Sequence, residues 1–274
     1  MCIRDRVIIP AFTAVPTAAA VMAIGATPVP VDVEPHTANL DPCLVEAART
    51  GRTRAVVVVH LYGRPATLPA TDLPIVEDAA QAHGAVSDHG RSAAVAYSFY
   101  PTKNLGGIGD GGAVATDDAE LAARVARLRV HGMTAQYVHE SVSQNFRMSE
   151  LEAAWLRIGL RGLDEGNARR RAISARYRQA APDLLWQAPS ADHVHHLCVL
   201  RAPDRDLFRA RLEQHGVGSA IHYPMAITQQ PAYSHLTRAA CPHAEAWAAS
   251  CVSVPCFPEL TDAEVERVAE ALAG

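Results

Sequence analysis

The fold is decided by one stretch of sequence, PIVEDAAQAHG at residues 74–84. An apolar strand is predicted there, and it ends in two carboxylates, Glu77 and Asp78, with Gln81 following about one turn later. Ligands of open α/β sheets bind beyond the carboxyl ends of the strands. The stretch therefore predicts a strand that delivers Asp78 and Gln81 to a crevice. A simple capping role for Asp78 at the start of a helix explains the same spacing equally well.

Similar apolar runs, rich in Val and Ile and bounded by turn residues, recur along the first half of the chain. They are near-continuous rather than alternating, which is typical of strands buried on both faces of a parallel sheet. Helical stretches lie between several of them, so the pattern predicts an α/β fold with right-handed crossovers. The predicted strands are Val7–Pro10, Pro28–Val33, Ala55–His60, Pro74–Glu77, Ala94–Tyr100 and Gly112–Thr116, and the predicted helices are Thr13–Ile24, one begun by Asp41 and Pro42, and Asp117–Val130.

The second half of the chain predicts a small α+β unit. Ser149 with Glu152, and Thr261 with Glu264, form capping boxes that mark two helix starts. We expect residues 1–165 to form a large domain, and residues 166–274 to form a connector helix and a small C-terminal domain. The predicted elements are helices Glu150–Leu160, Asp164–Ala181, Asp204–His215, His243–Ser250 and Asp262–Ala273, and strands His193–Arg201 and Val217–Tyr223.

Lys103 is the only lysine among the 25 Lys and Arg residues of this chain. Arginine can replace lysine as a surface charge, but it stays protonated and cannot serve as an amine nucleophile. A single retained lysine therefore indicates a use for a neutral amine, most commonly a Schiff base. Lys103 follows a strand that contains Ser98, and a glycine cluster at residues 106–112 follows Lys103. The alternative is a surface lysine on a mobile loop.

A third segment, QNFRMSELEAA at residues 144–154, places an amide and a guanidinium before a capped helix. Taken alone, Asn145 and Arg147 are also compatible with ordinary loop residues.

Bulk properties exclude several classes of protein. The 274 residues are 49% hydrophobic and 20% charged, with a net charge of −4 and no long basic stripe, which argues against a nucleic-acid partner. Six scattered cysteines form no CxxC pair, which predicts free thiols in a reducing compartment. No signal peptide or bilayer-spanning apolar run is evident, so we expect no membrane association and a cytoplasmic location.

These segments together resemble the DegT/DnrJ/StrS family of pyridoxal-phosphate-dependent sugar aminotransferases. The resemblance extends over nearly the whole chain from Val7, and the DAAQ and YPTKN motifs are its most specific parts. It implies an aspartate-aminotransferase-like (type I) large domain with a mainly parallel sheet and a small C-terminal α+β domain. The matching text is VEDAAQAHG at 76–84, SFYPTKNLG at 98–106, GDGGAV at 109–114, NFRMSELEAA at 145–154 and IHYP at 221–224.

The resemblance also implies roles for individual residues around the cofactor pyridoxal 5′-phosphate. Lys103 looks like the catalytic lysine that condenses with the cofactor aldehyde, and Asp78 like the carboxylate on the pyridinium nitrogen. Gln81 looks like the amide beside the ring hydroxyl, and Ser98 like a phosphate ligand. Asn145 is similar to an asparagine that reaches the phosphate from the other subunit, which implies a homodimer. The implied reaction transfers an amino group from an amino acid such as glutamate to a nucleotide-linked keto sugar.

The match is incomplete at the N-terminus. Family members carry a segment before the first strand, and its strand-to-helix turn cradles the cofactor phosphate. The residues before Val7 resemble translated adapter sequence, so we expect this chain to be an N-terminally truncated fragment. We also expect an exposed sheet edge beside residues 112–116. Ala14 and Thr228 stand where many relatives have an aromatic residue and a histidine.

Three alternatives remain open at this point. The first is a non-catalytic or regulatory protein on the same fold, and the second is an aminotransferase that acts on a cyclitol or another cyclic ketone. A metal protein is the third, because His193, His195 and His196 form a short cluster. Two ligands on one side of a strand fall short of a zinc site, so we expect no metal.

Overall fold

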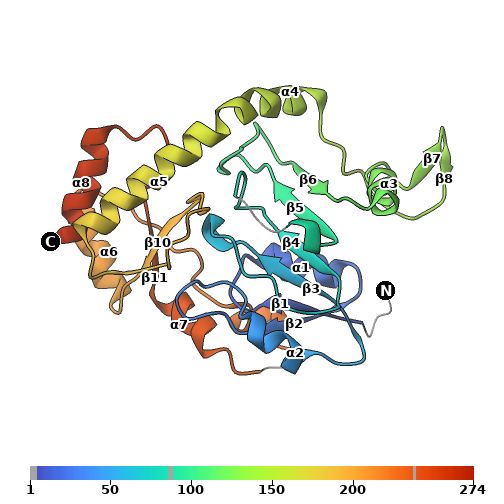
Figure 1. Cartoon of the computed structure of the whole chain (residues 1–274), viewed down its shortest axis with the longest axis horizontal. Coiled ribbons are helices and arrows are strands. Elements are labelled where there is room, and N and C mark those ends of the chain that lie inside the picture. The colour runs from blue at the N-terminus through green and yellow to red at the C-terminus, as the bar shows by residue number, and fades with distance from the viewer. Residues whose placement is uncertain (1–4, 86–88, 237–238) are drawn as a thin grey trace.

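A six-stranded sheet forms the centre of the larger part of the molecule in a computed structural model, which describes residues 5–85, 89–236 and 239–274 (Figure 1). The strand order is β2-β1-β3-β4-β5-β6, with every neighbouring pair parallel except β5 and β6. This confirms the predicted mainly parallel sheet. The strands are β1 (Arg6–Pro10), β2 (Thr27–Val31), β3 (Thr53–Val59), β4 (Ile75–Asp78), β5 (Ala94–Ser98) and β6 (Gly112–Ala115).

Both faces of the inner strands are buried, which explains their continuous apolar sequence. On β1, Ile8 packs into a cluster with Val56 and Val58 of β3, whereas Val7 and Ile9 pack on the opposite face. That second face is covered by helix α1 (Val15–Ala23) and by residues 227–236. Successive side chains of a strand alternate between faces, so a strand covered on both sides must be apolar throughout. By contrast, β6 lies at one edge and all four of its residues are exposed.

The C-terminal part is built around a separate core. A three-stranded antiparallel sheet in the order β11-β10-β9 packs with helices α5, α6 and α8, and every buried member of this core lies within residues 173–272. The elements are β9 (Leu185–Trp186), β10 (Cys198–Arg201), β11 (Cys251–Val254), α5 (Leu163–Ala180), α6 (Arg205–Gln214), α7 (Pro242–Ser250) and α8 (Asp262–Ala273).

The strands of this part differ most from the sequence predictions. The predicted strand at 193–201 is shortened to β10, because His195 adopts a positive φ of 43° and breaks the extended run. The predicted strand at 217–223 is irregular and keeps a single bridge, between Ala220 and Ser253. Strand β11 was not predicted, since it follows α7 directly with no turn residues between them.

Helix α7 returns to the first part of the chain. Its Trp247 packs with Phe12, with ring centroids 6.3 Å apart, and donates from Nε1 to the carbonyl of Pro35 at 3.1 Å. Its first turn is capped by Asp32, which follows β2 and accepts from the backbone N–H groups of His243 and Ala244 at 3.1 and 2.8 Å. One buried carboxylate thus ties the C-terminal part to the end of a sheet strand.

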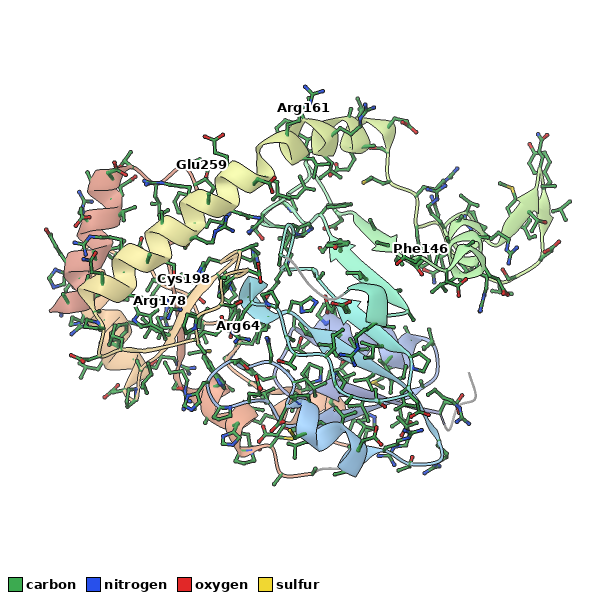
Figure 2. All side chains as sticks on the ribbon, in the orientation of Figure 1. Arg64, Phe146, Arg161, Arg178, Cys198 and Glu259 are labelled. Atoms are coloured by element: carbon green, nitrogen blue, oxygen red, sulfur yellow. The ribbon has the colours of Figure 1, made fainter. Side chains whose placement is uncertain are left out.

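Two consecutive helices arch over the molecule (Figure 1). Helix α4 (Glu150–Gly159) starts at Ser149, whose hydroxyl accepts from the backbone N–H of Glu152, and it runs through a 3₁₀ turn into α5. Before α4, the chain forms an arm of α3 (Ala119–Leu128), β7 (Met133–Ala135) and β8 (Val138–His139), which projects away from the sheet. Phe146 lies beside this arm (Figure 2). The second predicted capping box, at Thr261 and Glu264, is complete and begins α8.

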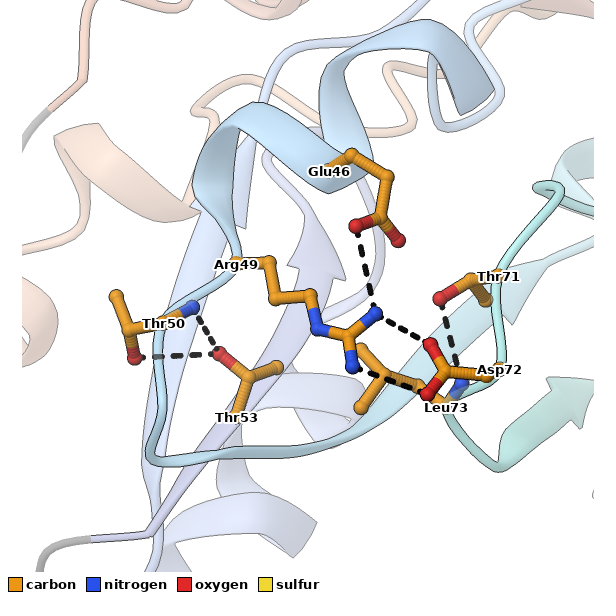
Figure 3. A network of polar contacts seen from close by, with 7 residues as sticks. All are labelled: Glu46, Arg49, Thr50, Thr53, Thr71, Asp72 and Leu73. Atoms are coloured by element: carbon orange, nitrogen blue, oxygen red, sulfur yellow. Dashed lines mark hydrogen bonds and ion pairs between the residues drawn. The ribbon is translucent and has the colours of Figure 1, made fainter.

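The helix predicted from Asp41 and Pro42 is short: a 3₁₀ turn leads into α2 (Val45–Ala48). Arg49, just after α2, bonds both carboxylate oxygens of Asp72 and also Glu46 (Figure 3). This surface network connects α2 to the loop that leads into β4. The 3₁₀ turns of the described chain are Pro42–Leu44, Leu61–Gly63, His89–Arg91, Leu160–Gly162, Ile227–Gln229 and Pro231–Tyr233.

The cysteines that the structure describes are all free: Cys43 is exposed, and Cys198, Cys241, Cys251 and Cys256 are buried. Cys2 and the other residues before Asp5 lie outside the described part of the chain. Within that part, none of the helices has both the length and the apolar character needed to cross a bilayer.

Candidate active site

The carboxyl ends of β4 and β5 bring two of the predicted residues to the same edge of the sheet. Asp78 is the last residue of β4, and its Cα pairs with Val59 of β3 and Ala96 of β5. Ser98 is the last residue of β5. Parallel strands end at one edge of their sheet, so this edge is where a ligand of an open α/β sheet binds.

The Asp78 carboxylate is held by one protein donor on each oxygen. Oδ2 accepts from Thr17 Oγ1 of α1 at 2.9 Å, and Oδ1 accepts from the backbone N–H of Ala80 at 3.1 Å. Residues 79–84 form turns rather than a helix, so Asp78 caps no helix. A carboxylate offers about four lone-pair sites, and at least two of them stay available to a ligand.

Gln81 has a fixed orientation. Its Oε1 accepts from the backbone N–H of Tyr62 at 2.6 Å, and its Nε2 donates to the Tyr223 hydroxyl at 3.1 Å. Tyr62 in turn donates its hydroxyl proton to the carbonyl of His222. The IHYP segment at 221–224 therefore lies against Gln81, and the second Nε2 proton of the amide has no acceptor among the residues that the structure describes.

Lys103 sits in a turn beyond β5, where its backbone N–H donates to the carbonyl of Tyr100 at 2.9 Å. Burial lowers the pKa of its side chain, while the nearby Asp78 carboxylate acts in the opposite direction. The positive charge of Lys103 also acts on three histidines, His83, His196 and His222. Burial is the larger cause and Lys103 the next in lowering the pKa of each, to about 4 for His83. This environment differs from that of a solvated surface lysine.

The glycine cluster after Lys103 lets the loop pack against other protein atoms. A Cβ on Gly106 would lie 2.3 Å from the carbonyl oxygen of Pro101, and one on Gly107 would lie 1.6 Å from Oε1 of Glu152. Trp155 of α4 donates from Nε1 to the carbonyl of Gly106 at 3.1 Å. Gly106 thus leaves room for the loop's own backbone, and Gly107 leaves room for a side chain of α4.

Ser98 and Asn145, two of the predicted site residues, make few side-chain contacts within one chain. Ser98 Oγ accepts from the backbone N–H of Tyr100 at 3.3 Å, and its hydroxyl proton has no acceptor among the residues that the structure describes. Asn145 is exposed on the segment next to the arm, and its Oδ1 accepts from the backbone and side chain of Arg147. The phosphate roles of Ser98 and Asn145 remain predictions.

The histidine cluster at 193–196 is engaged in protein contacts. The rings of His193 and His195 stack with centroids 3.7 Å apart. His193 Nδ1 accepts from the backbone N–H of His195, and Nε2 bonds Gln187, both at 3.0 Å. Over the residues described, no group of three or more His, Cys, Asp or Glu side chains is placed to hold a metal ion.

The sequence interpretation missed two side chains that contact the predicted residues. Thr17 was assigned only to a helix, although its position in the first turn after a strand was a usable signal. Tyr223 was noted only within a motif, and its contact with Gln81 spans 142 positions, which no local pattern can reveal.

A protein-family model described as the DegT/DnrJ/EryC1/StrS aminotransferase family matches residues 2–273. The chain belongs to this family. A curated relative, dTDP-3-amino-3,4,6-trideoxy-alpha-D-glucose transaminase of Streptomyces venezuelae, is 43% identical over 98% of this chain and 76% of its own length. The chain thus spans about three quarters of that relative.

Solved structures of family members share the fold. S. venezuelae DesV, in complex with a ketimine intermediate, has a TM-score of 0.91 and 42% identity, covering 98% of this chain and 77% of its own. The structure of ntda from Bacillus subtilis, with bound cofactor pmp, has a TM-score of 0.90 and 29% identity, covering 98% of this chain and 67% of its own. These matches confirm the type I aminotransferase fold and the pyridoxal-phosphate-dependent aminotransferase class that the DegT/DnrJ/EryC1/StrS motifs predicted.

Proposed function

We propose that this chain transfers an amino group from an amino acid such as glutamate to a keto sugar attached to a nucleotide. The observation that carries the proposal is the sheet edge at which Asp78 ends β4 and Ser98 ends β5, with the only lysine, Lys103, in the loop that follows β5. The sugar substrate is inferred from the S. venezuelae transaminase, whose name specifies a dTDP-amino sugar.

The residues present fit pyridoxal phosphate. Asp78 keeps free lone pairs on a fixed carboxylate and would hold the protonated ring nitrogen, while the free Nε2 proton of Gln81 would face the ring hydroxyl. Lys103 would bind the aldehyde carbon, and Ser98 would donate its hydroxyl proton to the phosphate. When bound, the cofactor supplies an electron-accepting ring and an aldehyde through which the amino group passes.

The lowered pKa of Lys103 suits a proton carrier. Burial disfavours the ammonium, so a larger share of the side chain is the neutral amine at a given pH below 10.5 than for a solvated lysine. Lys103 Nζ would take the proton from the α-carbon of the amino donor and later return one to the carbon of the keto sugar that receives the amine. Asp78, held by Thr17, would balance the positive ring nitrogen throughout.

Borohydride trapping tests the proposal. Protein mixed with pyridoxal phosphate should turn yellow, and reduction should fix the cofactor to the peptide that contains Lys103. Lys103→Arg is the matched control, because it keeps the charge and length but has no nucleophilic amine. Absence of trapping both in the unaltered chain and in a longer chain that carries the upstream segment of its relatives would reject the catalytic assignment and favour the non-catalytic alternative on the same fold.

We propose a homodimer in which Asn145 reaches the phosphate of the partner subunit. Leu151, Trp155 and Ile158 lie along one face of α4 and are 77, 52 and 66% exposed, and Phe146 next to Asn145 is 64% exposed. Exposed apolar residues gathered in this way are typical of a protein interface. The face borders the loop of Lys103, since Trp155 bonds Gly106.

The acceptor substrate can be identified by measuring the same transamination activity. A panel of keto sugars and cyclitol ketones with glutamate as donor would separate a sugar acceptor from another cyclic ketone.

We propose a cytoplasmic location, where nucleotide sugars and free thiols both occur. We also keep the division into residues 1–165 and 166–274 as a proposal, supported by the separate core of residues 173–272 and opposed by the packing of α7 on Phe12.

A further inference from the structure

Two buried hydroxyl groups are lined up behind the Asp78 carboxylate. Thr17 Oγ1 lies 2.9 Å from Asp78 Oδ2, and Thr13 Oγ1 lies 3.2 Å from Thr17 Oγ1. Thr13 and Thr17 are only 2 and 6% exposed, so water does not compete for these hydrogen bonds. Neither threonine belongs to the residues that the sequence motifs assign to the site.

The direction of the protons follows from the chemistry of the groups. An ionised carboxylate can only accept, so Thr17 must donate its hydroxyl proton to Asp78. The Thr17 oxygen is then free to accept, and Thr13 is placed to donate to it. The result is a one-way chain of hydrogen bonds from Thr13 through Thr17 to Asp78.

Thr17 also connects helix α1 to the end of β4. Thr17 is the third residue of this nine-residue helix, and the helix begins at Ala14 without any side-chain cap. The backbone N–H of Thr17 donates to the carbonyl of Ala14 at 3.2 Å, so the first turn of α1 holds Thr17 while its hydroxyl reaches Asp78.

We propose that Thr17, oriented by Thr13, is a positioning residue for Asp78: it fixes the carboxylate in the place from which it would hold the ring nitrogen of the cofactor. The inference rests on the proposed function, because it needs Asp78 to hold that nitrogen. Ala80 bonds the other oxygen, so the carboxylate can rotate little while Thr17 is present.

A purely structural role would be a tie between α1 and β4. In that case, loss of the hydroxyl would lower thermal stability but would weaken binding of any cofactor-shaped ligand equally. The positioning role predicts a selective effect, limited to ligands whose ring carries a basic nitrogen. The two roles therefore separate when two ligands are compared.

The test compares Thr17→Val, which keeps the shape but removes the donor, with Thr17→Ser, which restores it. Thr53→Val is the matched control, since Thr53 is also buried but lies at the opposite end of β3. For each protein we would measure the melting temperature without ligand, borohydride trapping at residue 103, and the affinities for pyridoxal phosphate and for its analogue with carbon in place of the ring nitrogen.

We expect Thr17→Val to bind pyridoxal phosphate roughly tenfold more weakly, as for one lost hydrogen bond to a charged group, and to bind the analogue as the unaltered chain does. Thr17→Ser and Thr53→Val should bind both ligands normally. If Thr17→Val does not fold, Thr13→Val, which leaves Thr17 and Asp78 intact but unoriented, should show a smaller loss that is again confined to pyridoxal phosphate.

The outcomes distinguish the two proposals. The positioning role alone would be overturned if the unaltered chain is trapped at Lys103 but Thr17→Val shows no selective loss. That is the case if its affinities for both ligands are unchanged, or if both fall equally. Absence of trapping both in the unaltered chain and in the longer chain would overturn the proposed function, and the role of Thr17 with it.

Discussion

The two regions that carry predicted site residues differ in how firmly one chain holds them. At the edge of the sheet, Asp78 and Gln81 are fixed by contacts from α1, from Tyr62 and from Tyr223. Asn145, in contrast, is exposed, and within the described residues its side chain bonds only Arg147, two positions further on. Under the proposed function, the contacts of one subunit would prepare the ring end of the cofactor site, and we expect the phosphate end to need donors from elsewhere.

The largest effect is expected when the two regions are inactivated on different chains. Lys103→Ala and Asn145→Ala should each lose activity, the former by about a thousandfold from the loss of acid–base catalysis. A refolded equal mixture should recover about a quarter of the unaltered activity, because half of the dimers are hybrids with one intact site. Transamination rates before and after mixing measure this. No recovery would mean that Asn145 acts within its own chain or not at all.

Buried histidines should make the site region sensitive to acid. His83 lies between Tyr97 and Phe99, and burial, followed by the charge of Lys103, lowers its pKa from 6.5 to about 4. The unfolded chain binds a proton below pH 6.5 and the folded chain does not until about pH 4, so the stability from His83 is lost as the pH falls through this window.

The loss amounts to about 3 kcal/mol for a shift of this size. Urea unfolding at several pH values should show it, and His83→Phe, which fits between the two rings, should flatten the dependence. His36→Gln on the surface serves as the control. An unchanged slope in His83→Phe would show that other groups govern the acid response.

A smaller loss of folding stability is expected when Asp32, which caps α7 from the end of β2, is replaced. Asp32→Ala removes the acceptor of two backbone N–H groups and should cost about 2 kcal/mol, the upper range for a lost cap. Asp32→Asn keeps one side-chain oxygen and should lose less. Thermal melting compares the two, and equal losses would point to charge rather than hydrogen bonding as the cause.

The smallest effect should follow from the surface network of Figure 3. The hydrogen bond from Arg49 lowers the pKa of the Asp72 carboxyl, so its contribution is present near neutral pH and is lost in acid. Both side chains are exposed and screened by salt, so Arg49→Ala should leave the melting temperature nearly unchanged. A large drop would show that the loop before β4 depends on this contact.

Local patterns predicted the parts of the structure that depend on local physics. The continuous Val and Ile runs gave the inner strands, and the residues at Ser149 and Thr261 gave the starts of α4 and α8. The resemblance then brought Lys103 and Asp78 together, which periodicity alone could not do. The residues that hold Asp78 and Gln81 escaped prediction, because Thr17 and Tyr223 reach them across 61 and 142 positions.

The presence of a single lysine among the basic residues also has a practical consequence. A protease specific for lysine can cut the unfolded chain at a single peptide bond, which yields residues 1–103 and 104–274. Any group attached covalently to that side chain would block the cut and leave one band on a denaturing gel. The chemistry of position 103 can therefore be followed by chain length alone, in crude samples and without a spectrum.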